Sequence, residues 1–425
     1  MRSRSDSGHS GTRRRLIYAG FAAGLGAAAA WRWWPEQGWM NPCLGRLPPH
    51  LANHELVQAA WAGVNPEQVW DCHAHLVGTG DAGSGIWVNP RMESWLHPVQ
   101  NAQRLFYLNA GCAGNKAGHV DESYVERMRN LLDDMRPGVK MMLLAFDYNY
   151  RDDATLAREA SSFYTPNEYA QRIARAFPGH FEWIASIHPY RQDAVAALEK
   201  AVGDGARAVK WLPAAMGIDP ASPLCDPFYA ALAKLDMPLL SHAGIERAVE
   251  TAAEGLNNPL KLRRALERGV RVLVAHCAST GEDRDIDRGD NGPVVGSFTL
   301  FTRLMDEPAH AGRLFGDLSA MPQVNRSSAA LASVIERTDW HPRLINGSDY
   351  PLPGIMPLYS VVEMVERKLI DPGVAPVLTA IRRHNPLLFD FVLKRHLQSG
   401  GKRFAASVFA TKPFFTRRDA RRGAT

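Results

Sequence analysis

Residues 69–76 read VWDCHAHL, and this stretch places two histidines one residue apart at the end of an apolar run. Side chains of an extended strand alternate between two faces, so His73 and His75 point to the same side, with their Cα atoms about 6.5–7 Å apart. Two imidazoles held in this way can bind one metal ion, or they can be satisfied by hydrogen bonds at a polar strand end. The rest of the chain decides between these two interpretations.

Short apolar or β-branched runs recur along the chain, with helical patterns between them. The predicted strands are 68–75, 139–147, 181–188, 206–212, 238–243, 271–276, 314–319 and 344–349. Eight strands alternating with helices predict an α/β fold, a (β/α)₈ TIM barrel, over residues 68–395. We expect the long loops after the first strand (76–138) and after the sixth strand (277–312) to cover the catalytic face.

Polar residues that can bind metals or move protons fall near the carboxyl ends of these predicted strands. In chain order they are His73 and His75, His188, Lys210, His242, His276, Asp317 and Asp349. The carboxyl ends of barrel strands meet at one face, which is where active sites of such barrels form. Taken together, the histidines 73, 75, 242 and 276 with Asp349 predict a metal site at this face.

Several motifs resemble those of one known family. They are DCHAH (71–75), LLSHAG (239–244), LVAHC (273–277), NGSDYPL (346–352) and IRRHNPLLFDFV (381–392), the last containing Asn385. Over about residues 68–395 the chain resembles the amidohydrolase superfamily. Within it, the chain looks most like the amidohydrolase-related branch, also called amidohydrolase 2, which contains aminocarboxymuconate-semialdehyde decarboxylase. The resemblance implies a divalent metal, usually zinc, bound by His73, His75, His242 and Asp349. His276 would then lie beside the open coordination position.

The residue types agree with this chemistry on their own. Imidazole and carboxylate suit Zn²⁺, and a catalytic site keeps one position open for water, whose pKa the metal lowers toward ~7. Asp349 would bind the metal and accept a proton, while His276 would polarise the substrate carbonyl or stabilise the oxyanion. Asp71 would orient a ligand histidine from behind.

Lys210 leaves the number of metal ions open. In binuclear members of the superfamily a lysine on the fourth strand is carboxylated and bridges two ions, and His276 would then be a ligand as well. Lys210 can instead neutralise a carboxylate of the substrate. We expect one metal ion per chain.

Three functions are compatible with the sequence. The first is a metal-dependent hydrolase that acts on an amide, ester or lactone carbonyl of a small molecule. The second is a non-oxidative decarboxylase of the same family, for which Arg91, Arg191 and Lys210 are candidates to hold the departing carboxylate. The third is a non-catalytic binding barrel with a structural metal. The sequence does not identify the substrate or the oligomeric state.

Aromatic residues in the long first loop allow two interpretations. Trp87, Trp95, Phe106 and Tyr107 can line an apolar pocket, or they can form a small core that packs the insertion. We expect the small core.

The two ends of the chain carry most of the positive charge. Residues 1–34 have a net charge of +5 and residues 402–425 of +6, which leaves −6 for the part between them. That part gives no reason to expect nucleic-acid binding. We expect residues 35–67 to be an N-terminal extension, and residues 396–425 to be a basic tail that is solvated from Phe404 onward.

The first 34 residues have the pattern of an export signal. Arg13, Arg14 and Arg15 precede a run of apolar and small residues from 16 to 31, and the arginine pair resembles a twin-arginine signal. This predicts a signal peptide or an uncleaved membrane anchor over residues 1–34. The protein would then be exported, either to the periplasm or anchored to the inner membrane, with membrane association through its N-terminus.

Cysteine usage is sparse. There are five cysteines and no C-x-x-C pair, so we do not expect a disulfide framework. Cys72 and Cys277 each adjoin a histidine of interest. If those histidines face the barrel interior, both cysteines should face the surrounding helices.

Overall fold

Eight parallel strands form the centre of the molecule in the computed structural model, which describes residues 35–114, 117–246, 249, 251 and 254–417. The strands are β1 (Trp70–His75), β3 (Lys140–Leu144), β5 (Phe181–Ile184), β6 (Val209–Trp211), β7 (Leu239–Ser241), β8 (Val272–Val274), β11 (Leu314–Asp317) and β12 (Leu344–Ile345). Each of the eight falls inside a predicted strand. They pair in the orders β1-β3-β5 and β12-β11-β8-β7-β6, all parallel.

Single bridges close these two sheets into one barrel. Ala185, after β5, pairs with Val209 of β6, and the Lys210 amide donates to the Ala185 carbonyl over 2.7 Å. On the other side Ala74 of β1 pairs with Tyr350, which follows β12. The predicted (β/α)₈ barrel is therefore present.

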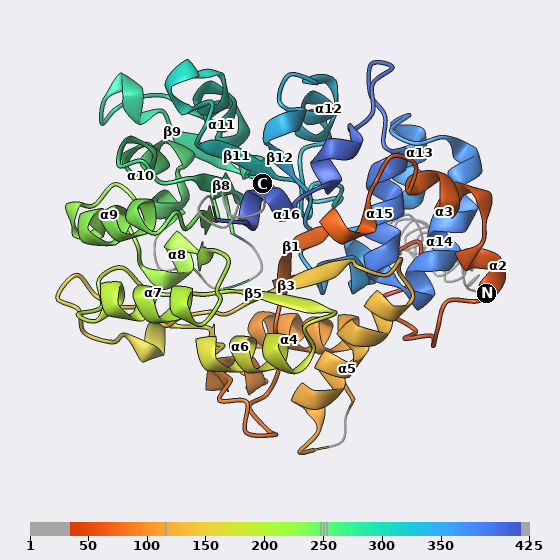
Figure 1. The fold of residues 1–425 in the computed structure, drawn as a ribbon, viewed down its shortest axis with the longest axis horizontal. Helices are drawn as coiled ribbons and strands as arrows, with labels where there is room; N and C mark the ends of the chain where they lie inside the picture. The colour runs from red at the N-terminus through yellow and green to blue at the C-terminus, as the bar shows by residue number, and fades with distance from the viewer. Residues whose placement is uncertain (1–34, 115–116, 247–248, 250, 252–253, 418–425) are drawn as a thin grey trace, which may run out of the picture.

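Helices surround the barrel (Figure 1). Those that follow successive strands are α5 (Val120–Asp133), α6 (Asn167–Ala176), α7 (Ala194–Gly203), α9 (Asp226–Lys234), α10 (Arg263–Glu267), α11 (Ser297–Asp306), α12 (Ser328–Glu336) and α15 (Pro386–His396). The others are α2 (Pro49–Ala52), α3 (Glu55–Ala60), α4 (Pro98–Ala110), α8 (Pro213–Met216), α13 (Val361–Glu366), α14 (Ala375–His384) and α16 (Lys412–Phe415). Two antiparallel strand pairs are added: β2 (Trp87–Val88) with β4 (Phe163–Tyr164), and β9 (Glu282–Arg284) with β10 (Val294–Gly296).

Alternate residues of each strand face two different cores. Met142 and Leu144 of β3 belong to the cluster inside the barrel, while Met141 and Leu143 pack against the surrounding helices. In β1 the register shifts between Asp71 and Ala74, so strict alternation is lost. Cys72 consequently faces the barrel interior, and the expectation that it faces the helices is wrong. Cys277 does belong to the outer core.

The C-terminal segment closes the barrel instead of forming a solvated tail. Phe404 and Phe409 are buried in the outer core, and Phe414 and Phe415 of α16 belong to the cluster inside the barrel. The guanidinium of Arg271, just before β8, donates to the Phe414 carbonyl over 2.6 Å. Figure 1 shows α16 across the centre of the ring of strands. The prediction of a solvated segment from Phe404 onward is therefore wrong up to residue 417.

The N-terminal extension is attached to the insertion after β1 by a disulfide. Cys43 and Cys112 are bonded, with their Cα atoms 5.7 Å apart, and 69 residues separate them in the chain. No motif or spacing in the sequence indicates this pair. The amide of Asn41 also donates to the side chain of Asn109 near the end of α4. Residues 41–43 are thus fixed to the C-terminal end of α4.

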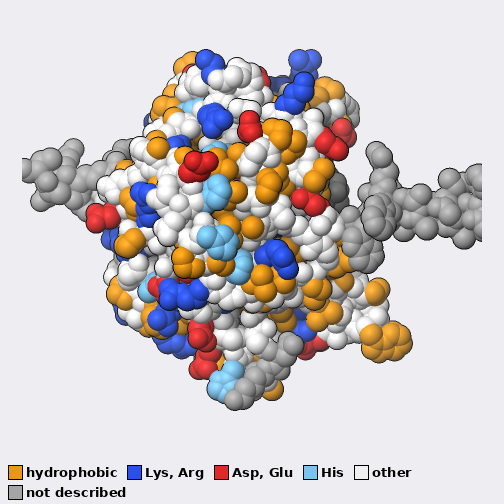
Figure 2. Space-filling model, turned by 90° about the vertical axis from the view of Figure 1, so that its right-hand side faces the viewer, with side chains coloured by type: hydrophobic (Ala, Val, Ile, Leu, Met, Phe, Trp, Pro, Cys, Tyr) orange, Lys and Arg blue, Asp and Glu red, His pale blue; other side chains and the backbone are white. Residues whose placement is uncertain are grey.

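The predicted export signal or anchor, residues 1–34, lies outside the described residues. Within the part of the chain that the structure describes, no helix has both the length and the apolar composition needed to cross a membrane. Exposed hydrophobic side chains nevertheless gather toward the right-hand edge of the molecule in Figure 2.

Candidate metal centre

The barrel brings the predicted site residues together at the carboxyl ends of its strands. They come from β1 (His73 and His75), β6 (Lys210), the residue after β7 (His242), the turn after β8 (His276) and the segment after β12 (Asp349). All six line one cavity of about 330 Å³. His188 does not line this cavity. Its Nε2–H donates to the Met216 carbonyl over 2.9 Å, and burial lowers its pKa to about 3.

Two of these residues have an unusual backbone conformation. The φ angle is 55° at His276 and 61° at Asp349. Non-glycine residues rarely adopt this left-handed region, and each such residue costs on the order of 1–3 kcal/mol. Cys277 and Ala278 follow His276 with φ angles of 51° and 49°. Strain of this kind is typical of functional sites, where the fold holds a side chain in a required direction.

His73 is oriented by the carboxylate of Asp317, the last residue of β11. Its Nδ1 lies 2.7 Å from Oδ2 of Asp317, and both side chains are buried. Because a carboxylate can only accept, Nδ1 carries the proton and the lone pair of Nε2 faces the cavity. Ser319 supports Asp317 by donating both its amide, over 2.7 Å, and its hydroxyl to the carboxylate. Burial and the nearby Lys210 lower the pKa of His73, which favours the neutral ring.

His242 and His276 follow the same arrangement with other acceptors. Nδ1 of His276 donates to the Ser319 carbonyl over 2.9 Å, and Nδ1 of His242 lies 3.2 Å from a carboxylate oxygen of Glu246. Each Nε2 therefore keeps its lone pair. Nε2 of His242 is buried and has no hydrogen-bond partner among the described residues. Burial lowers the pKa of His242 to about 4 and that of His276 well below the usual range.

Asp349 lies among these imidazoles. Its Oδ1 is 3.2 Å from Nε2 of His75 and 3.4 Å from Nε2 of His73, and its Oδ2 is 3.6 Å from Nε2 of His276. A carboxylate facing imidazole lone pairs at these distances is the donor set that a divalent cation satisfies.

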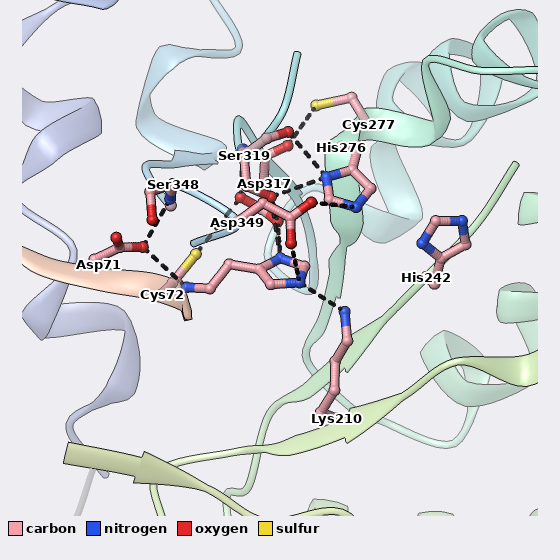
Figure 3. Close-up of polar contacts among 12 residues, drawn as sticks. Asp71, Cys72, Lys210, His242, His276, Cys277, Asp317, Ser319, Ser348 and Asp349 are labelled. Carbon is pink, nitrogen blue, oxygen red and sulfur yellow. Dashed lines mark hydrogen bonds and ion pairs between the residues drawn. The ribbon is translucent and has the colours of Figure 1, made fainter. Parts of the chain in front are cut away.

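The donor atoms fit a metal ion, although the five predicted residues are not equally close. The ligand atoms of His73, His75 and Asp349 lie within 4.8 Å of one another. Those of His73, His276 and Asp317 do so as well, but Asp317 is already engaged with Nδ1 of His73. Figure 3 shows His276 and Asp349 directed toward each other, with the ring of His242 standing apart. The His242 and His276 ring centroids are 5.3 Å apart.

Lys210 is the only lysine that lines the cavity among the described residues. Its Nζ lies 3.1 Å from Nε2 of His73, to which it donates (Figure 3). Burial lowers the pKa of Lys210, with the charge of Asp349 acting in the opposite direction. In its deprotonated form this amine could give up its contact with His73 to a metal ion, and it could also form a carbamate.

Asp71 does not orient a ligand ring as expected. It accepts hydrogen bonds from the backbone amides of His73 (3.1 Å) and Ser348 (2.7 Å). It therefore connects β1 to the segment that follows β12, and the ring of His73 is held by Asp317. The shifted register of β1 explains why Asp71 does not have the expected role, because it leaves Asp71 and the His73 ring on different sides of the strand.

The cavity is predominantly apolar, and the first long loop contributes much of its wall. Phe106 and Tyr107 line it, in agreement with the pocket interpretation and against the small core. Trp87 instead packs against Tyr148, and Trp95 is exposed to solvent. The loop after β8 contributes little beyond His276 itself, so it does not cover the face as expected. The segments after β7, β11 and β12 line the remaining wall.

Arg326 is a lining residue that the sequence did not single out. It follows β11 by nine positions, and its guanidinium donates to the hydroxyl of Thr280 over 3.0 Å. Its Nε is buried without a hydrogen-bond partner among the described residues. Of the expected carboxylate clamps, Arg191 is paired with Asp147 over 2.9 Å, and neither it nor Arg91 lines the cavity. No short motif marks Arg326, so only its position in the fold reveals it.

The fold and the site together define a (β/α)₈ barrel with a cluster of imidazoles and a carboxylate at the carboxyl ends of its strands. The amidohydrolase family model matches residues 70–354, which is more than half of the chain. The protein belongs to the amidohydrolase family, and the predicted membership in the amidohydrolase 2 branch is confirmed. Its relatives in this family are enzymes.

Solved structures of the same branch resemble the chain at low identity. A probable 2-pyrone-4,6-dicarboxylic acid hydrolase from Acinetobacter baumannii is 15% identical, with 67% of this chain and 84% of that chain covered and a TM-score of 0.39. A 5-carboxyvanillate decarboxylase from Sphingomonas paucimobilis is 13% identical, with 74% and 98% covered and a TM-score of 0.42. The 2,6-dihydroxybenzoate decarboxylase from Rhizobium is 12% identical, with 76% and 97% covered and a TM-score of 0.39. At these values the similarity does not identify a substrate. No curated protein matches the chain.

Proposed function

We propose that the protein is a metal-dependent hydrolase that acts on an amide, ester or lactone carbonyl of a small apolar molecule. The observation that carries this proposal is the common direction of three neutral imidazoles. In His73, His242 and His276 an oxygen atom accepts the hydrogen bond from Nδ1–H, so each Nε2 lone pair faces the cavity that Lys210 and Asp349 also line.

One zinc ion per chain, held by His73, His75, His242 and Asp349, is the arrangement that we favour. Imidazole and carboxylate ligands suit Zn²⁺. When bound, the ion would supply Lewis-acid activation of water and of the substrate carbonyl. Lys210 and His276 would join the ligand set only if a second ion were present.

His276 is suited to accept a proton more than to polarise a carbonyl. Its Nδ1–H is committed to the Ser319 carbonyl, and its lowered pKa keeps Nε2 without a proton at neutral pH. It can take the proton of the attacking water and return it to the leaving group. Asp349 Oδ2, 3.6 Å away, would stabilise the imidazolium that forms transiently.

A decarboxylase is the second candidate, and Arg326 favours it. A half-buried arginine on the cavity wall, whose buried Nε has no hydrogen-bond partner among the described residues, is suited to hold a substrate carboxylate. In this case the substrate would lose CO₂. Apart from Arg326, the residues of the site would have the same roles in hydrolysis and in decarboxylation.

Metal stoichiometry and turnover test these proposals together. For His276→Asn we expect nearly full zinc content and a loss of activity of about 10²–10³. For Asp349→Asn we expect the loss of both. Elemental analysis of these variants and of Lys210→Ala checks the ligand set. A wild-type ratio near two, with one ion lost in His276→Asn and in Lys210→Ala, would contradict the single-ion arrangement.

A substrate screen distinguishes the reactions. Carboxylated and uncarboxylated esters, lactones and amides would be offered with and without a chelator. Chelator-sensitive release of acid supports the hydrolase, and release of CO₂ supports the decarboxylase. Zinc-loaded protein that turns over no compound of either class would favour the non-catalytic binding barrel.

We also propose that the protein is exported through the signal in residues 1–34. The Cys43–Cys112 disulfide supports this, because disulfides persist in oxidising compartments such as the periplasm. Changing Arg13 and Arg14 to Lys should retain the precursor in the cytoplasm. Cell fractionation checks the prediction, and wild-type protein found wholly in the cytosol would refute it.

A further inference from the structure

Exposed apolar side chains are concentrated in two short segments, and each segment also contributes residues to the cavity wall. Twelve large hydrophobic side chains are exposed among the described residues, and six of them come from just two short segments. These are Trp39 (47% exposed), Met40 (53%), Trp95 (83%), Leu96 (66%), Val99 (65%) and Leu105 (51%). We call these six residues the rim patch. Large exposed patches of this kind mark interaction sites.

The rim patch is continuous with the cavity wall. Trp39 itself lines the cavity, as do Gln103 and Phe106 of α4. Val99 precedes Gln103 by four residues and Phe106 by seven, so the three side chains lie on one face of the helix. The wall of the cavity therefore extends outward along α4 to solvent.

The two segments are held together by covalent and polar contacts. Cys43 is bonded to Cys112, just beyond the end of α4, and the Asn41 amide donates to the Asn109 side chain over 2.8 Å. At the other end of α4 the side-chain amide of Asn101 donates to the Met92 carbonyl over 3.3 Å. The patch is thus built on a braced helix.

The two segments that carry the rim patch contain no acidic side chain, and the neighbouring Glu93 is paired with Arg104 over 3.1 Å. Residues 37–54 and 94–114 contain no aspartate or glutamate. Arg46 and Arg91 are exposed in or beside these segments. Tryptophan with aliphatic side chains and flanking arginines is the composition that settles at the boundary between lipid headgroups and acyl chains.

We propose that the rim patch docks on the surface of a lipid bilayer, so that the mouth of the cavity faces the membrane. The sequence before the described residues favours this occupant over a protein partner. Its apolar run at 16–31 ends only eight positions before Trp39, and Trp33 and Trp34 lie between them. A membrane-associated segment this close would hold the patch at the bilayer surface.

Site-directed spin labelling of the full-length, zinc-loaded protein tests the proposal. Leu96→Cys and Val99→Cys would carry the label, and Val294→Cys of β10, which is 57% exposed and outside the patch, is the matched control. The native free cysteines Cys72, Cys225 and Cys277 are buried, so they should not react. Vesicles would contain phosphatidylethanolamine and phosphatidylglycerol.

On vesicles we expect the labels at 96 and 99 to become accessible to oxygen and shielded from a water-soluble nickel complex. The label at 294 should stay accessible to nickel. Aqueous accessibility of all three labels would overturn the proposal. Immobilisation of the labels at 96 and 99 without vesicles would also overturn it. Dipolar broadening would then indicate a second copy of the chain on the patch. Immobilisation without broadening would indicate that the chain's own apolar segment covers the patch.

A partitioning experiment measures how much the rim patch contributes to vesicle binding when the N-terminal segment is unchanged. Replacing Trp95, Leu96 and Val99 together with Ser should weaken vesicle binding at least about tenfold, because the buried apolar area determines interfacial binding. The matched variant replaces Leu224, Ile286 and Val294 with Ser, and its binding should match wild type. Equal binding of both variants would overturn the proposal. Neither experiment depends on turnover, so the result is independent of the proposed hydrolase activity.

Discussion

At the scale of single residues, the site depends on which oxygen atom accepts the hydrogen bond from Nδ1–H of each imidazole. Asp317, Glu246 and the Ser319 carbonyl accept hydrogen bonds from Nδ1–H of His73, His242 and His276, respectively. Each imidazole is thereby fixed in the tautomer that a metal requires, before any ion binds. The sequence predicted the histidines from their positions at strand ends, but it did not predict these acceptors.

Asp317 offers a direct test of this interpretation. Asp317→Asn keeps the shape but removes the charge that orients His73, so zinc affinity should fall about 10–100-fold. Competition with a chromogenic chelator measures the affinity. Asp283→Asn is the matched control, because this buried carboxylate accepts from the Ser297 hydroxyl over 2.7 Å and contacts no ligand ring. Unchanged zinc affinity in Asp317→Asn would show that the carboxylate does not position the ligand.

At the scale of secondary-structure elements, the register shift in β1 and the short helix α16 determine how the two ends of the barrel are built. The register shift in β1 turns the rings of His73 and His75 toward the cavity while Cys72 remains inside the barrel. Helix α16, only four residues long, places Phe414 and Phe415 against the apolar interior at the opposite end from the site. The barrel is thus closed at one end by the C-terminal segment and open at the other to substrate.

Phe415 should therefore be a core residue despite its place near the C-terminus. Phe415→Ala should lower the free energy of unfolding by about 3–5 kcal/mol, which is usual for truncating a buried phenylalanine. Pro413→Ala, at an exposed position of the same helix, should change it little. Urea unfolding followed by tryptophan fluorescence measures both. A loss below about 1 kcal/mol in Phe415→Ala would contradict the packing of α16.

At the scale of the whole molecule, the parts outside the barrel strands build the entrance to the site. The N-terminal extension supplies Trp39, the insertion after β1 supplies α4, and the segment after β12 supplies Leu352 and Leu358. The Cys43–Cys112 bond joins the first two of these parts. Its 69-residue separation means that it restricts a long stretch of the unfolded chain.

Removing this bond should destabilise the protein without emptying the metal site. Cys43→Ser with Cys112→Ser should reduce the free energy of unfolding by about 2–4 kcal/mol. Zinc content should stay at the wild-type level, because neither cysteine contacts a ligand. Thiol titration of denatured wild-type protein should find three free thiols, the number of unbonded cysteines. Five free thiols would show that the bond does not form.

The sequence alone determined the barrel and the positions of the candidate metal ligands at its strand ends. Short apolar or β-branched runs separated by helical patterns predict eight strands, and the strand ends carry His73, His75, His242, His276 and Asp349. These inferences succeed because both depend on local periodicity and on a general rule of barrel geometry.

Only the tertiary structure decided what surrounds those donors. In the structure Asp317, and not the expected Asp71, orients His73. The structure also places Arg326 on the cavity wall and joins Cys43 to Cys112. It also brought α16 under the barrel. The physical reason is the same in each case. A one-residue change of register reverses which side chain faces which core, and the path of a long loop decides which distant residues meet, and neither leaves a periodic pattern in the sequence.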